Sequence, residues 1–186
     1  EHPSGSLPAL SSIAALPPWG GNPREFTASL ITSLGEGEVS EFLQNPHRSD
    51  VTAAVLPASD KAGMEKLIAD GIPFLARVSS PDEIVGLPKG IAGLRIDRDN
   101  LCDELLMERA GRLGKPTVIG VDRDLTTGDI LIGLTAFSRT GDPSRVVLLY
   151  SGDTNSDSFS SAGTIRQDFD LPLGFQLSKE ALTADR

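Results

Sequence analysis

The sequence is poor in the residues that bind metals and form disulfides. Its 186 residues include one cysteine, Cys102, and two histidines, His2 and His47. A single cysteine excludes a disulfide within the chain and a cysteine-rich metal centre. Neither histidine has a second ligand at a usable spacing, so the sequence predicts no metal site and no bound cofactor.

Long apolar runs and an excess of positive charge are also lacking. No apolar segment approaches the roughly 18 residues that a membrane span needs. Lysine and arginine together number 17, against 26 aspartates and glutamates, which gives a formal net charge of −9. Nucleic acids and anionic membranes attract basic patches, so this balance argues against both as partners.

The start of the chain bears on its cellular compartment. The sequence begins with Glu1 rather than Met, which indicates processing or trimming, and it lacks a basic, apolar signal segment. We expect a soluble protein of a reducing compartment, such as the cytoplasm or an organelle interior after N-terminal processing. The sequence does not distinguish between these compartments.

The composition is typical of one globular domain. Hydrophobic residues make up 39% of the chain and charged residues 23%, which is enough to bury one sizeable core at this length. Residues 1–10 are rich in proline, serine and glycine, and we expect an extended lead-in there. Residues 11–186 are then a single domain.

The clearest local pattern runs from Asn100 to Ile130. Asn100 is a candidate cap for a helix that ends at Gly114. Four leucines are expected near one face of this helix: Leu101, Leu105, Leu106 and Leu113. A buried type of strand follows at 117–121, and Thr126 or Thr127 starts the next helix. The polar residues between strand and helix stand where β/α proteins place their functional groups.

The same alternation of strand and helix recurs along the chain. We expect strands at 12–16, 51–56, 73–78, 94–97, 117–121, 145–150 and 173–177. Between these strands we expect a first helix that starts at 22–25 and has Phe26, Leu30 and Leu34 at helical spacing, and a second helix around 39–43. A third helix has Met64, Leu67 and Ile68 on one face, and a fourth opens at the capping box 80–83. Two further helices cover about 128–138 and 164–169. Such alternation predicts parallel strands joined by crossovers.

Seven strands fall short of a full (β/α)₈ barrel, which usually needs about 250 residues. The sequence therefore predicts an α/β fold, a minimal or incomplete TIM-type barrel with about seven parallel strands. An open doubly wound parallel sheet is the alternative, and the periodicity does not separate the two. Neither the Rossmann glycine fingerprint nor a Walker A loop is present. A shortened barrel is expected to leave an apolar seam, which a protein partner or a second copy would cover.

Several segments together resemble one known family. They are the run 93–97, the helix end and strand 112–119, the helix start 126–130, the apolar strand 146–151 and the passage 164–175. In this order they resemble the sialic acid (N-acetylneuraminate) synthase family. The resemblance implies a synthase-like β/α barrel for residues 11–186. In the family, such barrels make N-acetylneuraminate and related sugars from phosphoenolpyruvate.

The family's chemistry does not carry over with the fold. Ala15 stands where the family has a glutamate, Arg95 replaces a lysine, and the stretch 176–178 replaces the first metal-binding histidine motif. We therefore predict no catalytic residues and a pseudoenzyme, a catalytically degenerate barrel that acts as a structural or interaction subunit of a larger assembly. The alternative is a phosphoenolpyruvate-dependent sugar-acid synthase or aldolase-type enzyme with a rearranged site, which would form a carbon–carbon bond.

Charged residues on or directly after three successive strands are the candidate ligand-binding residues. They are Arg95, Asp97, Arg98, Asp122, Arg123 and Asp153. Carboxylates of this kind can bind Mg²⁺ or Mn²⁺, and arginines can hold a phosphate or a carboxylate. The same residues also serve as helix caps and ion pairs, so a ligand site and a structural role both stay open.

The apolar faces of these elements predict the core. We expect nine side chains to be buried: Leu105, Leu113, Val118, Ile119, Leu134, Phe137, Val147, Leu149 and Leu173.

Overall fold

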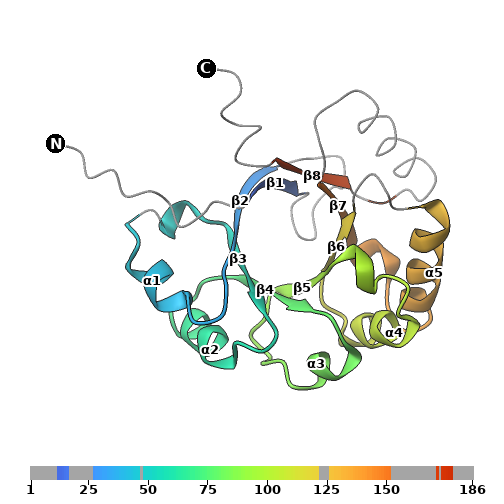
Figure 1. Cartoon of the computed structure of the whole chain (residues 1–186), viewed down its shortest axis with the longest axis horizontal. Helices are drawn as coiled ribbons and strands as arrows, with labels where there is room; N and C mark the ends of the chain where they lie inside the picture. The colour runs from blue at the N-terminus through green and yellow to red at the C-terminus, as the bar shows by residue number, and fades with distance from the viewer. Residues whose placement is uncertain are drawn as a thin grey trace, which may run out of the picture.

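The computed structural model describes residues 12–16, 27–46, 48–121, 126–151, 171 and 173–177, and these form a closed barrel of strands with helices outside it (Figure 1). The strands follow one another around the barrel in sequence order. They are β1 (Ser12–Leu16), β2 (Thr27–Ser33), β3 (Ala53–Pro57), β4 (Phe74–Val78), β5 (Gly93–Ile96), β6 (Thr117–Val121), β7 (Val146–Ser151) and β8 (Leu173–Leu177).

The described helices lie in the connections between parallel strands. They are α1 (Val39–Gln44), α2 (Lys61–Ala69), α3 (Pro81–Val85), α4 (Glu104–Leu113) and α5 (Thr127–Ser138), with short 3₁₀ turns η1 (Arg48–Asp50), η2 (Arg98–Asn100) and η3 (Pro143–Arg145). Within the described ranges, every helix falls short of the length and apolar character that a membrane span requires.

The predicted minimal TIM-type barrel is confirmed. Strands β2 to β8 are seven parallel neighbours. Strand β1 has the predicted bounds but runs antiparallel to both β2 and β8. A parallel crossover needs about a dozen residues or more, and the link 17–26 is shorter than that, whereas an antiparallel neighbour needs only a hairpin. Strand β1 was among the seven expected strands, and the eighth strand is β2, which was not expected; because β1 pairs directly with β8, the expected open seam is absent from the described barrel.

The expected helix containing Phe26, Leu30 and Leu34 is wrong over residues 27–33, which form β2. Threonines and isoleucine in this segment favour a strand, because branching at Cβ restricts their side chains in a helix. Ile31 joins the apolar cluster inside the barrel, whereas Leu34, just after the strand, joins the cluster outside it. The expected helix start at 22–25 lies outside the described residues.

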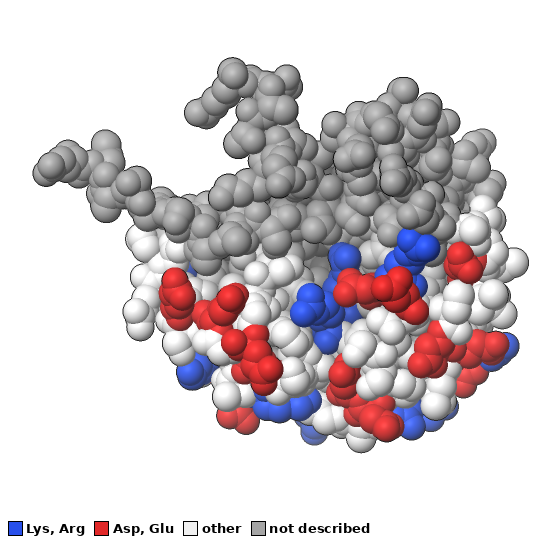
Figure 2. All heavy atoms as spheres, in the orientation of Figure 1, with Lys and Arg blue, Asp and Glu red and all other residues white. Residues whose placement is uncertain are grey.

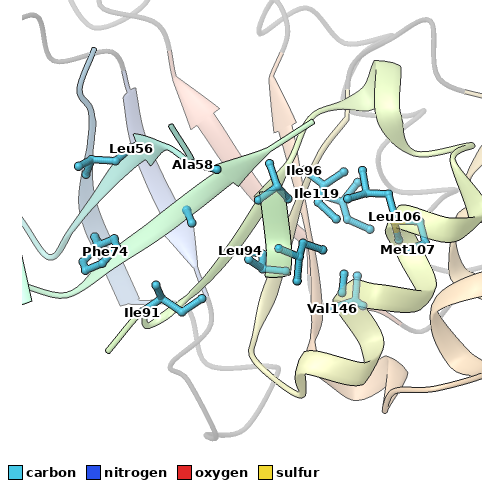
Figure 3. Packing of buried hydrophobic residues seen from close by; sticks show 14 of the residues in the cluster. Leu56, Ala58, Phe74, Ile91, Leu94, Ile96, Leu106, Met107, Ile119 and Val146 are labelled. Carbon is cyan, nitrogen blue, oxygen red and sulfur yellow. The ribbon is translucent and has the colours of Figure 1, made fainter. Parts of the chain in front are cut away.

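The core consists of two apolar layers separated by the sheet. The larger layer lies between the strands and the helices, and Figure 3 shows Ile119 of β6 beside Leu106 of α4. The smaller layer fills the barrel and contains Ile31, Val55, Leu75, Val118, Val147 and Leu149. Alternate residues of each strand supply the two layers, because strand side chains point to opposite faces in turn.

The predicted starts of α3 and α5 agree with the structure, whereas that of α4 does not. Thr126, one of the two predicted helix starts, caps α5, and it does so in a complete capping box with Asp129. Helix α4 begins at Glu104, and its cap is Asp103 rather than Asn100, with the Asp103 carboxylate accepting from the Leu106 N–H at 3.0 Å. Ser80 makes no side-chain capping bond to α3. Gly114 ends α4 in a left-handed conformation with φ of 68°, as expected.

Most of the predicted core is confirmed, but two leucines of α4 are not buried. Val118, Ile119, Leu134, Phe137, Val147 and Leu149 are buried, whereas Leu105 is 52% exposed and Leu113 is 36% exposed. The later start of α4 directs Leu106, Met107, Ala110 and Gly111 at the barrel, so Leu105 points away from it, and Leu113 lies at the helix end. Ile68 of α2 is also exposed. The side chain of Leu173 lies outside what the structure describes.

Truncation of Leu149 to Ala is expected to destabilise the protein by about 2–5 kcal/mol, because a buried leucine inside a packed cluster leaves a cavity. The exposed Leu105 is the matched control, and Leu105→Ala is expected to change the free energy of unfolding by roughly 0.5 kcal/mol or less. Urea unfolding followed by circular dichroism measures both. Equal effects of the two substitutions would contradict the placement of β7.

Candidate functional site

A cavity of about 180 Å³ opens toward the carboxyl ends of the parallel strands. Its lining comes from β2 to β6, from β7 and from the residue that follows β5 by one position. The lining residues are Ile31, Ser33, Val55, Leu75, Arg77, Arg95, Asp97, Val118 and Leu149. In β/α barrels this end of the strands is the functional face.

The lining is apolar at its base and charged toward the opening. Residues two apart on a strand share one face, so Leu75 and Arg77 both point into the barrel, and so do Arg95 and Asp97. The base belongs to the inner apolar cluster. A ligand in this cavity, which we call the mouth chamber, would therefore meet aliphatic carbons below and charged groups above.

Arg77 and Arg95 are neighbours across the sheet. They are direct register partners on β4 and β5, and adjacent strands lie about 4.8 Å apart. The Arg95 Nε donates a hydrogen bond to the Asp97 carboxylate at 2.9 Å, and the Arg95 side chain is only 15% exposed. Among the described residues, Arg77 has neither a hydrogen-bond nor an ion-pair partner. The described chamber wall thus holds two positive charges and one negative charge.

Two of the six predicted ligand residues, Arg95 and Asp97, line the mouth chamber. Arg98 lies in η2 and is absent from the chamber lining; its charge acts instead on Asp129. Asp122, Arg123 and Asp153 lie outside the described residues, so their assignment stays a prediction.

Sequence reasoning missed Arg77 and Ser33. Arg77 stands three residues after the start of β4, as the only charged residue in an otherwise buried strand. Two signals could have identified Arg77 as an interior residue. Alternation along β4 places it on the same face as Leu75, and its register partner on the next strand is Arg95. Ser33, the last residue of β2, was hidden by the incorrect assignment of that segment to a helix.

The cysteine lies away from the mouth chamber. The Cys102 Sγ is 3.6 Å from a carboxylate oxygen of Asp129. Partial burial raises the pKa of Cys102, and the hydrogen bond and negative charge of Asp129 raise it further. Hydrogen bonds from the hydroxyl and backbone N–H of Thr126 lower the pKa of Asp129. The thiol therefore stays protonated at neutral pH and is a weak nucleophile.

Acidic, cysteine and histidine side chains do not gather elsewhere in the described part of the chain. Across that part, no three of them lie close enough together to hold a metal ion. On the visible surface, acidic and basic side chains lie beside one another rather than in separate fields (Figure 2).

Comparison with solved structures shows which known proteins have a similar fold. No family model matches the sequence, and no curated protein matches it. An N-acetylneuraminic acid synthetase from Leptospira borgpetersenii, solved with citrate, matches at 14% identity and a TM-score of 0.60, over 88% of this chain and 70% of that one. A spore coat polysaccharide biosynthesis protein from Bacillus subtilis matches at 10% identity and a TM-score of 0.63, over 80% and 52%.

A truncated 3-deoxy-D-arabino-heptulosonate 7-phosphate synthase from Thermotoga maritima also matches, at 15% identity and a TM-score of 0.59, over 81% of this chain and 65% of that one. The chain thus spans about half of the spore coat protein and about two thirds of the other two. At these identities the likeness establishes the fold, which is a TIM-type β/α barrel. This barrel is similar to those of the Leptospira synthetase and the Bacillus spore coat protein, in agreement with the likeness that the sequence segments indicated.

Proposed function

We propose that this protein is a catalytically degenerate barrel of the sugar-acid synthase type that still binds a small organic acid in the mouth chamber. The observation that carries the proposal is the register pair Arg77 and Arg95, which lines one cavity with a single described carboxylate, Asp97. The acid carries a carboxylate or a phosphate, because guanidinium groups match the planar oxygen pairs of these anions.

The charge and size of the mouth chamber support this proposal. The chain as a whole carries a formal charge of −9, yet the described chamber wall has an excess of one positive charge. Adjacent like charges repel, and an anion between them would relieve that repulsion. At about 180 Å³ the chamber is below the roughly 300–1,000 Å³ of a typical drug-sized pocket, which favours a small acid over a nucleotide.

The direction of β1 supports the loss of synthase activity. The resemblance aligns Ala15 with a glutamate of the family's first strand, and that strand is expected to run parallel to its neighbours. Here β1 is antiparallel to β2 and β8, so the carboxyl end of β1 lies beside Thr27, at the opposite end of β2 from Ser33. A residue at the end of β1 therefore cannot serve the mouth chamber as it would in a parallel strand.

Binding of phosphoenolpyruvate is expected to depend on both arginines. Loss of a hydrogen bond to a charged group is worth about 1.5–3 kcal/mol, so Arg77→Gln and Arg95→Gln should each weaken binding roughly 10- to 100-fold. Isothermal titration calorimetry measures the affinity. Arg109→Gln is the matched control, because Arg109 lies on α4 and pairs with the exposed Asp82.

Citrate, which accompanies the Leptospira structure, is a second probe that separates recognition of carboxylate from recognition of phosphate. Retention of wild-type affinity for both phosphoenolpyruvate and citrate in both variants would show that the chamber arginines bind neither, and the proposed function would then be wrong.

No sugar-acid synthesis is expected from this chain. Addition of phosphoenolpyruvate to a sugar carbonyl needs a polarising group and a residue that moves a proton, and loss of one acid–base element lowers the rate about 10²- to 10⁴-fold. Phosphate release from phosphoenolpyruvate with N-acetylmannosamine, with and without Mn²⁺, measures this, with a sialic acid synthase assayed in parallel. Clear turnover would favour the enzyme with a rearranged site.

A role as an interaction subunit is the second candidate, and the outer helices favour it. Leu105 of α4 is exposed, and on α5 Leu131 is 56% exposed and Ile132 is 46% exposed. Large apolar side chains in water are unfavourable, and burial against a partner or a second copy would remove them from it.

The mass in solution is expected to exceed the 19.6 kDa of one chain. Substitution of Leu131 and Ile132 together by Asp should return the protein to one chain, because a charge at a buried interface is costly. Ala62→Asp, at an exposed position of α2, is the control, because Thr135 and other residues three or four positions along α5 share the face of Leu131 and Ile132. Light scattering over a range of concentrations measures the mass, and a wild-type protein that stays at 19.6 kDa would exclude self-association.

A further inference from the structure

Gly120 makes room for the guanidinium of Arg95. Gly120 lies on β6, two residues after Val118, and Val118 is a register partner of Arg95 on the neighbouring strand. A Cβ atom at position 120 would overlap the Arg95 Nη2 and would lie 2.9 Å from Cζ and 3.3 Å from Nε. Any side chain at this position therefore has to displace the guanidinium.

Glycine is otherwise unfavourable at this position. The other residues of β6 are threonine, valine and isoleucine, all branched at Cβ and all buried. Glycine inside a strand weakens it, because it has no side chain to pack and loses more backbone freedom on folding. Within strands such a glycine often marks a close approach of another group, and here the approaching group is the charged end of Arg95.

Asp97 holds the same guanidinium from the other side. It accepts a hydrogen bond from Nε, which is one of the five N–H bonds of the arginine head. Arg95 would otherwise be free to turn toward solvent along its flexible stem. The hydrogen bond to Asp97 and the room left by the missing side chain of Gly120 together keep the Arg95 guanidinium in one position, inside the mouth chamber rather than outside it.

We propose that Gly120 and Asp97 are positioning residues for ligand recognition, because they hold the Arg95 head where its Nη groups meet the anionic end of a bound acid. This inference rests on the proposed function. The anion affinity of the chamber then depends in part on Gly120, a residue without a side chain.

Gly120→Ala is expected to weaken phosphoenolpyruvate binding about tenfold or more, through displacement of Arg95. Gly128→Ala is the matched control, because a Cβ at Gly128 meets only the Thr126 hydroxyl at an ordinary 3.5 Å. In an Arg95→Lys background the guanidinium is gone, so the added Gly120→Ala should change the affinity less than about twofold. A purely structural role of Gly120 would weaken binding equally in both backgrounds.

A measurement without ligand tests the position of the arginine head directly. In protein labelled with ¹⁵N-arginine, the Arg95 Nε–H resonance, assigned by its loss in Arg95→Lys, is expected to move in Gly120→Ala and in Asp97→Asn. The same resonance should stay in place in Gly128→Ala. An unmoved Arg95 resonance in Gly120→Ala would overturn the inference.

The two proposals fail in different ways. If Arg95→Gln weakens binding but Gly120→Ala does not, the positioning role is wrong and the acid-binding function stands. If Gly120→Ala moves the Arg95 resonance while neither arginine variant changes the affinity, the position of the head is as described but it binds no phosphoenolpyruvate, and both the proposed function and the recognition role are overturned.

Discussion

The pairing of β1 with both β2 and β8 is the contact on which the whole barrel depends. Seven parallel strands alone leave two unpaired edges, and exposed edge strands invite aggregation. One short antiparallel strand satisfies both edges and so encloses the inner apolar cluster. A full β/α unit would have required a crossover and its helix. Closure by a hairpin thus explains how a chain of 186 residues can complete a barrel that usually needs about 250.

Closure also determines where charge can be placed inside the molecule. Below the mouth, interior positions are occupied by packed aliphatic residues, and a charge there would lack water and partners. At the carboxyl ends the chamber is open, so Arg77 and Arg95 keep contact with solvent or with Asp97. The change from Leu75 to Arg77 along one strand marks the boundary between the two environments. The same alternation that builds the core therefore delivers the charged groups to the functional face.

The sequence predicted the elements whose signals are local and missed those that depend on neighbours. Strand β6, which is buried on both faces, and the start of α5 at Thr126 or Thr127 both follow from signals within a few residues, and both predictions were correct. Strand β2 was assigned to a helix because Phe26, Leu30 and Leu34 recur at helical spacing, although of these three only Leu30 lies within the bounds of the strand. Asp103 and Asn100 are equally good caps in isolation, and the packing of Leu106 and Met107 decides between them. Asp97 was found because it follows a strand, and Arg95 because the resemblance places it where the family has a lysine, whereas Arg77 required the register of β4 against β5.

The two halves of the barrel are under different constraints, and this bears on how binding and chemistry can separate. The acid-binding groups proposed above stand on β4, β5 and β6, which are parallel and keep the arrangement common to such barrels. Ala15, which the resemblance aligns with a glutamate of the family, stands on β1, which is antiparallel to both of its neighbours. The direction of β1 does not affect the positions of Arg77, Arg95 and Gly120, because each of these lies on a strand with parallel neighbours. Likeness of fold at 10–15% identity therefore indicates which end of the barrel is the functional face. Activity depends instead on the particular side chains that reach that face.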